Sequence, residues 1–317
     1  MMDFRETFEK SSFLITDGGI ETRIAYETPI QMDPDMSVFQ LVYDSKGKKA
    51  LQKIYRQYLD IGEHYDIPIQ IGTPTFRASP GRLQRLGFIA PQDTQRVNID
   101  CVHMHQELRG GYGDYARKIF IAGVVGPKGD AYKPEEAPDE KEAETYHKPQ
   151  IEALTQAGVD LLFAPTFPSA YELYCVAKAM AASGLPYVLS PIIRSDGKLL
   201  DGTSFNEMIS HLDKSVSPRP AYYTISCVHP SVCRKALLVQ KQQPSEQIQR
   251  IRGIKANTSS RTPEELASLH KLDTEDPEIF ANELMGLRKE FGFKILGGCC
   301  GTDDRHINGI ASKLCAS

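Results

Sequence analysis

The sequence predicts an α/β fold in which eight strand-and-helix units close into one (β/α)8 barrel of the TIM type. Three observations predict it: short apolar segments alternate with longer segments of helical periodicity, eight such pairs fill the chain, and no linker-like composition divides it. Barrels of this class commonly reach the chain's length of 317 residues as one unit. We therefore expect a single barrel domain over residues 1–317.

Eight segments are expected to form the strands. Several are almost continuously apolar, as parallel strands buried on both faces are. In chain order they are Phe13–Gly19, Ile67–Phe76, Ile119–Pro127, Asp160–Phe167, Pro186–Ile193, Ala221–Cys227, Gly253–Thr258 and Lys294–Gly298. The alternative is an open doubly wound sheet, but no G-x-G-x-x-G follows the first strand, which disfavours its dinucleotide-binding form.

Helices are expected between the strands, because apolar residues recur there at steps of three and four and several segments end at a glycine suited to a left-handed cap. The clearest are residues 47–65, 91–110, 139–158, 169–184 and 276–292. Two long loops, residues 126–138 and 194–204, follow the third and fifth strands. In a barrel both would lie at the mouth formed by the carboxyl ends of the strands.

Composition and charge narrow the class of partner. Hydrophobic residues make up 41% and charged residues 25%, as in soluble globular proteins, and the net charge of −4 comes without a long basic run. We therefore expect small-molecule partners and no nucleic acid. No apolar run approaches the roughly 20 residues that span a bilayer, and the charged start does not resemble a secretory signal, so we expect no membrane partner and a cytoplasmic location. The sequence indicates no oligomeric state.

The stretch "GGCCG" near the end of the chain points to a metal site. Adjacent residues of a regular strand face opposite sides, so Cys299 and Cys300 can converge only where the strand breaks its pleat, which Gly297, Gly298 and Gly301 permit. Adjacent Cα atoms lie about 3.8 Å apart, too close for an ordinary disulfide. Zinc binds convergent thiolates, and a catalytic zinc takes three protein ligands and leaves one position open.

Cys227 is the best candidate for the third ligand, because "AYYTISCVHPS" predicts a strand that ends at this cysteine. His229 follows two residues later and is either a fourth ligand or a side chain at a helix start. The other cysteines are interpreted as small buried apolar residues: Cys101, Cys175, Cys233 and Cys315. His103 and His105 are two residues apart on a predicted helix and should diverge rather than share a metal.

A second group of candidate residues lies in "FLITDGGIETRI", at the end of the first predicted strand. Asp17 places a carboxylate at the mouth, and Gly18 and Gly19 let a ligand approach the backbone, with Glu21 in the turn beyond. The alternative is a simple strand-ending turn, since Asp-Gly is a common turn dipeptide. Beside a zinc site, the stretch would supply a carboxylate for the ammonium of an amino acid and free amides for its carboxylate.

Together these motifs resemble those of the homocysteine S-methyltransferase family. The resemblance covers most of the chain. It is carried by "DGGIET", "GTPTFRAS", "VGP", "AGVDLLFAPTFPSAYEL", "ISCVHP" and the closing "LGGCCGT". It implies a TIM barrel that holds zinc through Cys227, Cys299 and Cys300, which act in catalysis through the metal. It also implies that Thr75 and Phe76 belong to the substrate pocket.

The implied chemistry is transfer of a methyl group from a small activated donor, a sulfonium, an ammonium or a similar compound, to a thiol. Homocysteine is the expected acceptor, with methionine as product. Two positions depart from the family pattern, because Pro165 and Pro74 replace polar residues of the expected amino-acid pocket. The alternatives are a different thiol acceptor, a barrel that binds zinc and thiol without turnover, and an unrelated barrel lyase or hydrolase with incidental cysteines.

Overall fold

Eight parallel strands close into a barrel in the order in which they occur in the chain, from β1 beside β2 round to β8 beside β1. The computed structural model describes residues 2–241, 246–262, 265 and 272–316. The strands are β1 Leu14–Thr16, β2 Ile69–Gly72, β3 Ile119–Val124, β4 Leu161–Phe167, β5 Tyr187–Pro191, β6 Tyr222–Val228, β7 Ile251–Ala256 and β8 Ile295–Gly298. Each lies in or overlaps one of the eight predicted segments, so the predicted barrel is confirmed.

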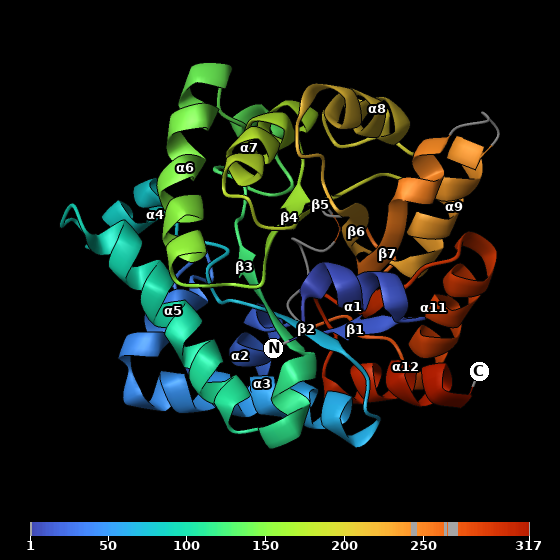
Figure 1. The fold of residues 1–317 in the computed structure, drawn as a ribbon, viewed down its shortest axis with the longest axis horizontal. Helices are drawn as coiled ribbons and strands as arrows, with labels where there is room; N and C mark the ends of the chain where they lie inside the picture. Colours follow the sequence, from blue (N-terminus) through green and yellow to red (C-terminus); the bar gives the residue numbers. More distant parts are fainter. Residues whose placement is uncertain (1, 242–245, 263–264, 266–271, 317) are drawn as a thin grey trace.

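Helices surround the barrel, and the five clearest predicted helices are all present (Figure 1). The α-helices are α1 Phe4–Lys10, α2 Glu21–Glu27, α3 Ser45–His64, α4 Pro80–Arg85, α5 Asp93–Gly110, α6 Glu140–Gln156, α7 Ala170–Ala182, α8 Phe205–Ser215, α9 Pro230–Lys241, α11 Pro277–Phe291 and α12 Asp304–Ala316. Short 3-10 helices are η1 Val38–Tyr43, η2 Gly113–Lys118, η3 Pro134–Glu136 and η4 Glu246–Arg250. Among the described residues, no helix is long and apolar enough to cross a membrane.

The ends of the long helices follow local sequence signals. Helix α3 begins after Asp44, whose side chain accepts a hydrogen bond from the Gly47 N–H. Helix α11 begins after Asp276, which accepts from two backbone N–H groups, and it ends at Gly292 in the left-handed conformation with φ 70°. These caps fix the first residue of α3 and both ends of α11.

Helix α1 closes the amino end of the barrel, and the sequence pattern did not predict it. Phe4 packs edge-on against Phe120 of β3 at a centroid distance of 5.3 Å, and Phe8 stacks on Tyr222 of β6 at 4.4 Å. Figure 1 shows α1 lying across the middle of the molecule with other helices around it. These aromatic rings fill the amino end of the barrel interior, and the pocket described below lies at the opposite end.

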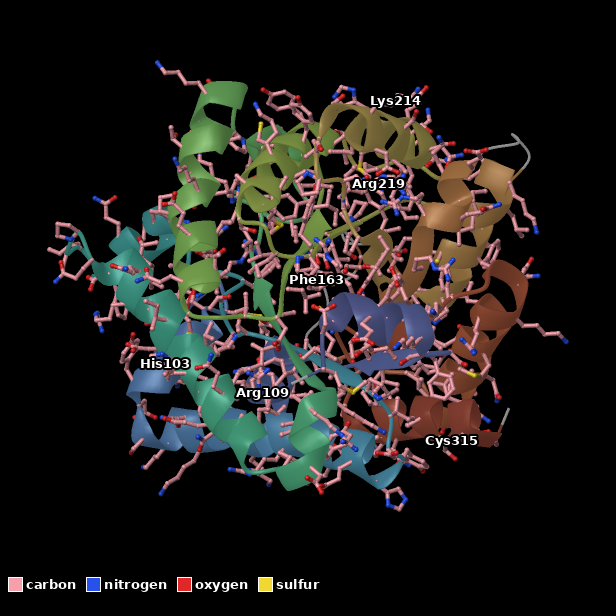
Figure 2. All side chains as sticks on the ribbon, viewed as in Figure 1. His103, Arg109, Phe163, Lys214, Arg219 and Cys315 are labelled. Atoms are coloured by element: carbon pink, nitrogen blue, oxygen red, sulfur yellow. The ribbon has the colours of Figure 1, made fainter. Side chains whose placement is uncertain are left out.

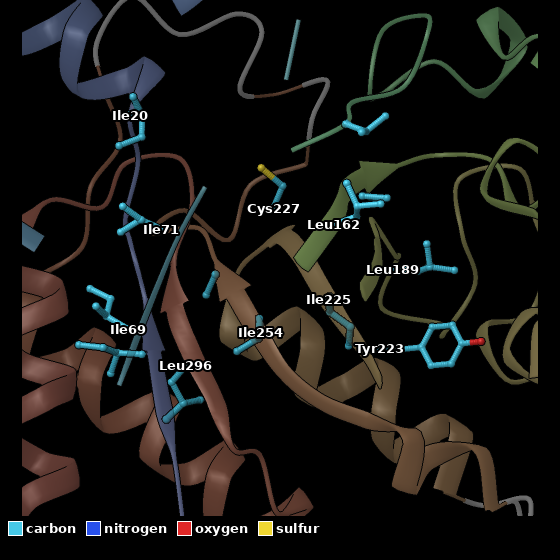
Figure 3. Close-up of a cluster of buried hydrophobic side chains, with 14 of the residues drawn as sticks. Ile20, Ile69, Ile71, Leu162, Leu189, Tyr223, Ile225, Cys227, Ile254 and Leu296 are labelled. Carbon is cyan, nitrogen blue, oxygen red and sulfur yellow. The ribbon is translucent and has the colours of Figure 1, made fainter. Parts of the chain in front are cut away.

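The strands β4 and β6 each contain an irregularity near their carboxyl ends. The pairing of β6 with β7 skips one residue between Ser226 and Val228, which leaves Cys227 as the extra residue of a β-bulge. The pairing of β4 with β5 skips Thr166 in the same way. In Figure 3, Cys227 lies beyond the buried apolar side chains of Ile225 and Ile254. Cys227 therefore lies at the carboxyl end of the apolar barrel core.

Candidate metal centre and pocket

Three cysteine sulfurs meet at the carboxyl end of the barrel. The Cys227 Sγ lies 2.7 Å from the Cys299 Sγ and 3.7 Å from the Cys300 Sγ. All three sulfurs lie within 4.8 Å of one another, in a cluster that could hold a metal ion. Cys227 comes from β6, and the other two come from the turn that follows β8. The structure thus brings together the three cysteines that the sequence analysis selected.

The β-bulge in β6 turns Cys227 toward the other two thiols. Its φ of +58° lies in the left-handed region, which a residue with a side chain rarely adopts and which costs on the order of 1–3 kcal/mol. The Asn257 Nδ2 donates to the Cys227 carbonyl at 2.9 Å and helps hold this conformation. Sequence reasoning placed a break in the pleat only beside Cys299 and Cys300, so it missed the bulge at Cys227.

The glycines around the cysteine pair have two different roles. Gly301 has a φ of +82°, so the turn after Cys300 uses the conformational freedom of glycine. Gly297 and Gly298 belong to β8, where a Cβ would lie 1.9 Å from the Thr16 Oγ1 and 2.1 Å from the Thr302 Oγ1, respectively. These two glycines therefore serve close packing, whereas the sequence analysis expected them to bend the strand.

The Cys227 thiol is hydrogen-bonded to the thiols of Cys299 and Cys300. Hydrogen bonds from Cys299 and Cys300 hold the pKa of the Cys227 thiol well below its usual value. The same hydrogen bonds to Cys227 raise the pKa of Cys299 and of Cys300. A bound cation would favour the thiolate form of all three, because opposite charge stabilises an anion at short range.

Asp17 lies in the pocket beside the thiols, as predicted for the mouth, but its carboxylate already has partners. One oxygen, Oδ2, accepts from the Gly72 N–H at 2.7 Å, and the other, Oδ1, forms an ion pair with the Lys255 ammonium. The Gly19 N–H donates to Thr302, at 3.0 Å to the side chain and 3.2 Å to the carbonyl. This differs from the expectation of a free amide at Gly19.

A pocket of about 240 Å³ opens onto the three sulfurs. Its walls include apolar side chains from several strands and loops, among them Phe76, Val124 and Phe163. The polar and charged residues that line it, apart from the cysteines, are Asp17, Glu21, Thr22, Asp35, Tyr55, Gln70, Thr73, Arg77, Tyr132, Thr166, Ser226 and Lys255. A small ligand in this pocket would touch both the thiols and charged groups.

The predicted substrate-binding residues divide into two groups. Asp17, Gly18, Gly19, Glu21 and Phe76 line the pocket. Thr75 is not among the lining residues.

The Thr75 hydroxyl donates to the Val124 carbonyl at 2.6 Å and lies 2.7 Å from the Thr73 hydroxyl. This hydrogen bond links the segment after β2 to the end of β3, behind the pocket surface. The departures at Pro74 and Pro165 do lie on the pocket surface, so they shape it directly.

The pocket residues that sequence reasoning missed include Arg77, Tyr132 and Lys255. Lys255 could have been suspected, because a lone lysine inside a buried strand needs an anionic partner at the barrel interior. Arg77 follows Phe76 directly and stacks on its ring, with 4.7 Å between the guanidinium carbon and the ring centroid. Tyr132 belongs to the loop after β3, and no sequence pattern in that loop indicated that this residue lines the pocket.

The remaining cysteines lie away from the pocket. Cys101, Cys175 and Cys233 are buried, as expected of small apolar residues. Cys315 was predicted to be buried and is instead exposed, on the outer face of α12 near the end of the chain (Figure 2).

The histidines that the sequence analysis considered as ligands also lie outside the thiol cluster. The Nε2 of His229 lies 3.4 Å from a carboxylate oxygen of Glu275 and of Glu283. His229 is therefore not a fourth member of the thiol cluster. His103 is exposed on the outer side of α5 (Figure 2), whereas His105 is fully buried, and the two diverge as predicted.

Comparison with known protein families gives a match over residues 14–314 to the family model described as homocysteine S-methyltransferase. The chain belongs to this family. It is accordingly a methyltransferase, and the resemblance seen in its motifs is confirmed.

Two curated relatives show how far the homocysteine S-methyltransferase family likeness extends. The homocysteine S-methyltransferase of Escherichia coli is 23% identical over 234 residues, which is 71% of this chain and 72% of the relative. The homocysteine S-methyltransferase 1 of Arabidopsis thaliana is also 23% identical, over 320 residues, 95% of this chain and 93% of the relative.

A similar solved structure is the metallated form of the Escherichia coli homocysteine methyltransferase MmuM. It superimposes with a TM-score of 0.77 over 98% of this chain and 99% of that chain, at 19% identity. At that identity the likeness shows the fold alone, and it agrees with the barrel described above.

Proposed function

We propose that this member of the homocysteine S-methyltransferase family transfers a methyl group from a small activated donor to homocysteine, giving methionine, with a zinc ion held by Cys227, Cys299 and Cys300. The donor class is a sulfonium, a quaternary ammonium or a similar compound. The observation that carries the proposal is a cluster of three thiols that opens onto a pocket lined by charged residues.

The thiols fit a catalytic zinc site in number and chemistry. Among the described residues the cluster has three members, and three protein ligands with one open position are the mark of catalytic rather than structural zinc. Soft thiolates favour zinc over magnesium or calcium. A tetrahedral site with zinc–sulfur bonds of roughly 2.3 Å separates two sulfurs by about 3.8 Å.

The spacing of the sulfurs supports the same assignment. The 3.7 Å between the sulfurs of Cys227 and Cys300 already matches this value, while the 2.7 Å to Cys299 requires the two sulfurs to separate by about 1 Å. A small side-chain rotation at the turn after β8 would supply that separation.

When bound, zinc would lower the pKa of a coordinated thiol, so that the acceptor sulfur is present as thiolate near neutral pH. The thiol proton passes to solvent. In the transfer itself, a carbon–sulfur bond forms on the acceptor while the bond from the methyl carbon to the donor sulfur or nitrogen breaks, and the donor leaves with that electron pair. No side chain needs to accept a proton from carbon, so an acid–base pair is not required.

The chain's own contribution is orientation and exclusion of water. Phe76, Val124 and Phe163 form apolar walls around the thiols, and holding two reactants in line can lower the barrier by roughly 7–11 kcal/mol. Reduced thiols are needed throughout, and every cysteine of the described chain is free. This supports a reducing compartment, and we propose the cytoplasm.

The test combines metal analysis with product identification. Purified protein is analysed for zinc and then incubated with L-homocysteine and methyl-labelled donors, one sulfonium and one quaternary ammonium compound. We expect close to one zinc per chain and labelled methionine by mass spectrometry with at least one donor. Zinc-loaded protein that produces no labelled methionine with either would contradict the proposal and favour a barrel that binds zinc and thiol without turnover.

A further inference from the structure

Three carboxylates line the pocket, and two of them are already paired. Asp17 accepts from the Gly72 N–H and is in an ion pair with Lys255. Asp35 lies 2.5 Å from the Arg82 Nη1. A carboxylate held in this way by a buried cation is poorly available to a second cation, because a new partner must displace the first.

Glu21 is the third carboxylate, and it differs from the other two. In the part of the chain that the structure describes, its side chain has neither an ion pair nor a hydrogen bond to another side chain. Burial and the nearby Cys227 and Asp17 raise the pKa of Glu21, and the positive charge of Arg77 acts in the opposite direction. Glu21 thus presents an unpaired carboxylate to the same space as the thiols.

Of the two cationic side chains in the pocket, Lys255 is paired with a carboxylate and Arg77 is not, among the described residues. The Lys255 ammonium binds residues at the end of β1. It forms an ion pair with the Asp17 carboxylate and lies 3.0 Å from both the Thr16 hydroxyl and the Asp17 carbonyl. Arg77 donates from Nη1 to the Gly129 carbonyl at 3.0 Å and has no carboxylate within ion-pair distance among the described residues. Burial and the nearby Arg82 lower the pKa of Arg77 to about 10, so it remains charged at neutral pH.

The pocket therefore carries one unpaired negative charge, on Glu21, and one unpaired positive charge, on Arg77, beside the three thiols. Unpaired charges in a partly buried site are unfavourable unless a ligand neutralises them. The buried amide oxygen Oε1 of Gln70, which also lines the pocket, has no hydrogen-bond partner among the described residues either. An α-amino acid carries an ammonium and a carboxylate on one carbon and complements all of these groups.

We propose that Glu21 binds the ammonium group of the amino-acid thiol acceptor and Arg77 binds its carboxylate, while Lys255 withdraws Asp17 from substrate binding. The inference rests on the proposed function and deepens it, because it assigns the acceptor contacts to this chain's own residues. Asp17 then acts as a positioning residue that joins β1, β2 and β7 beneath the pocket. Its pairing with Lys255 makes Glu21 the determinant of selectivity for an amino group.

The experiment uses thiols that each lack one charged group. Zinc-loaded protein is titrated by calorimetry with L-homocysteine, with 4-mercaptobutyrate, which lacks the ammonium, and with 3-mercaptopropylamine, which lacks the carboxylate. We expect the wild-type protein to bind homocysteine at least about 10-fold more tightly than either analogue, since a hydrogen bond to a charged group contributes about that factor or more.

The variants assign each contact. Glu21→Gln should weaken homocysteine binding about 10- to 100-fold and change binding of 4-mercaptobutyrate less than about twofold. Arg77→Met should weaken homocysteine binding by a similar factor and should change the binding of 3-mercaptopropylamine less than about twofold. Asp17→Asn is the matched control, a carboxylate-to-amide change in the same pocket, and should alter homocysteine and 4-mercaptobutyrate by the same factor. Zinc content and thermal unfolding check that each variant is loaded and folded.

Two results would overturn the inference. In one, Asp17→Asn abolishes the preference for an ammonium group while Glu21→Gln keeps it. In the other, Glu21→Gln weakens all three ligands equally, which would make Glu21 structural. Should Glu21→Gln fail to fold, Glu21→Asp, which retains the charge on a shorter arm, must keep a reduced preference for homocysteine over 4-mercaptobutyrate; a preference equal to that of the wild type would contradict the assignment.

The outcome is separable from that of the proposed function. Selective binding that depends on Glu21, in a protein that methylates no thiol, would support these contacts and refute turnover. Methionine formation by a protein whose selectivity does not depend on Glu21 would support turnover and refute the contacts.

Discussion

The amino and carboxyl ends of the barrel are built from the same eight strands and differ in almost every physical respect. At the amino end, Phe4 and Phe8 of α1 pack on Phe120 and Tyr222, and apolar contact fills the space. At the carboxyl end, the backbone bends at Cys227, and Asp17 and Lys255 form an ion pair across strands. The amino end is packed with aromatic rings around α1, while the carboxyl end carries a strained cysteine and an ion pair that line a pocket.

This difference teaches where stability and function are located in the molecule. Cys227, with its strained backbone, and the Asp17–Lys255 ion pair both line the pocket, and such strain costs free energy that packing elsewhere must offset. The closed end supplies the packing that tolerates them. If that division is right, substitutions at the two ends should affect different measurements.

The largest expected effect is at the open end. Cys227→Ala should remove the metal and lower methyl transfer to background, a loss of at least about four orders of magnitude, or roughly 5 kcal/mol in transition-state stabilisation. The unfolding transition should persist, because the packing at the closed end is untouched. Zinc content, turnover and thermal unfolding check this, with the exposed Cys315→Ser as control. Full activity of Cys227→Ala without zinc would show that the thiol cluster is not the active centre.

At the closed end, Phe4→Ala should lower the free energy of unfolding by about 3–5 kcal/mol, since it removes a buried ring and leaves a cavity. At a temperature where the variant stays folded, kcat/KM should remain within about twofold of the wild type, because no pocket residue is touched. Urea unfolding and steady-state kinetics measure the two quantities. A loss of kcat/KM with unchanged stability would break the division between the ends.

A third prediction concerns pH and His105, which lies behind the pocket wall. Its Nε2 bonds to the Gly72 carbonyl at 3.1 Å, its ring packs on Tyr55, and burial lowers its pKa to about 4. The unfolded chain has a histidine pKa of about 6.5, so between these values only the unfolded state takes up the proton. Stability is therefore full above about pH 6.5 and falls as the pH drops toward 4, by up to roughly 3 kcal/mol.

The pH prediction has a matched control on the same helix. Urea unfolding between pH 7.5 and 4.5 is measured for the wild type, for His105→Gln and for His103→Gln, whose side chain is exposed. We expect His105→Gln to lose this part of the pH dependence and His103→Gln to retain it. The same pH dependence in all three proteins would place its origin in other groups.

The smallest expected effect is again at the closed end. The Tyr222 hydroxyl is buried there without a hydrogen-bond partner among the described residues, and burial raises the pKa of Tyr222. Tyr222→Phe should be neutral or stabilise the protein by up to about 1 kcal/mol, because it removes an unsatisfied polar group. A destabilisation of more than about 1 kcal/mol in urea unfolding would indicate that this hydroxyl has a partner, and that the closed end is not purely apolar.

Much of the fold could be predicted because its signals are local. Each strand is an apolar run, and helices such as α3 and α11 have periodic faces and capping residues that the sequence displays directly. Helix α1 was missed because its 7 residues are too few for periodicity to stand out, and packing at the closed end stabilises it.

The candidate site was predictable in its residues and less so in its contacts. Cys227, Cys299 and Cys300 were selected because Cys227 ends one predicted strand and the other two directly follow another, and parallel strands in a barrel end on one face. The bulge that turns Cys227 was not visible, since nothing in "ISCVHP" marks a residue with positive φ. Lys255 was overlooked because its partner, Asp17, lies 238 residues away in the chain.

The sequence by itself determined the barrel, its family and the three thiols, because these depend on local propensity and on the order of the strands. Only the tertiary structure decided which charges are free. Asp17 and Glu21 are four residues apart and chemically alike, yet Lys255 reaches Asp17 from β7, and Glu21 has no such partner among the described residues. Pairing of charges is a property of distance in space, and that distance is set when β7 and β1 close the barrel around β8.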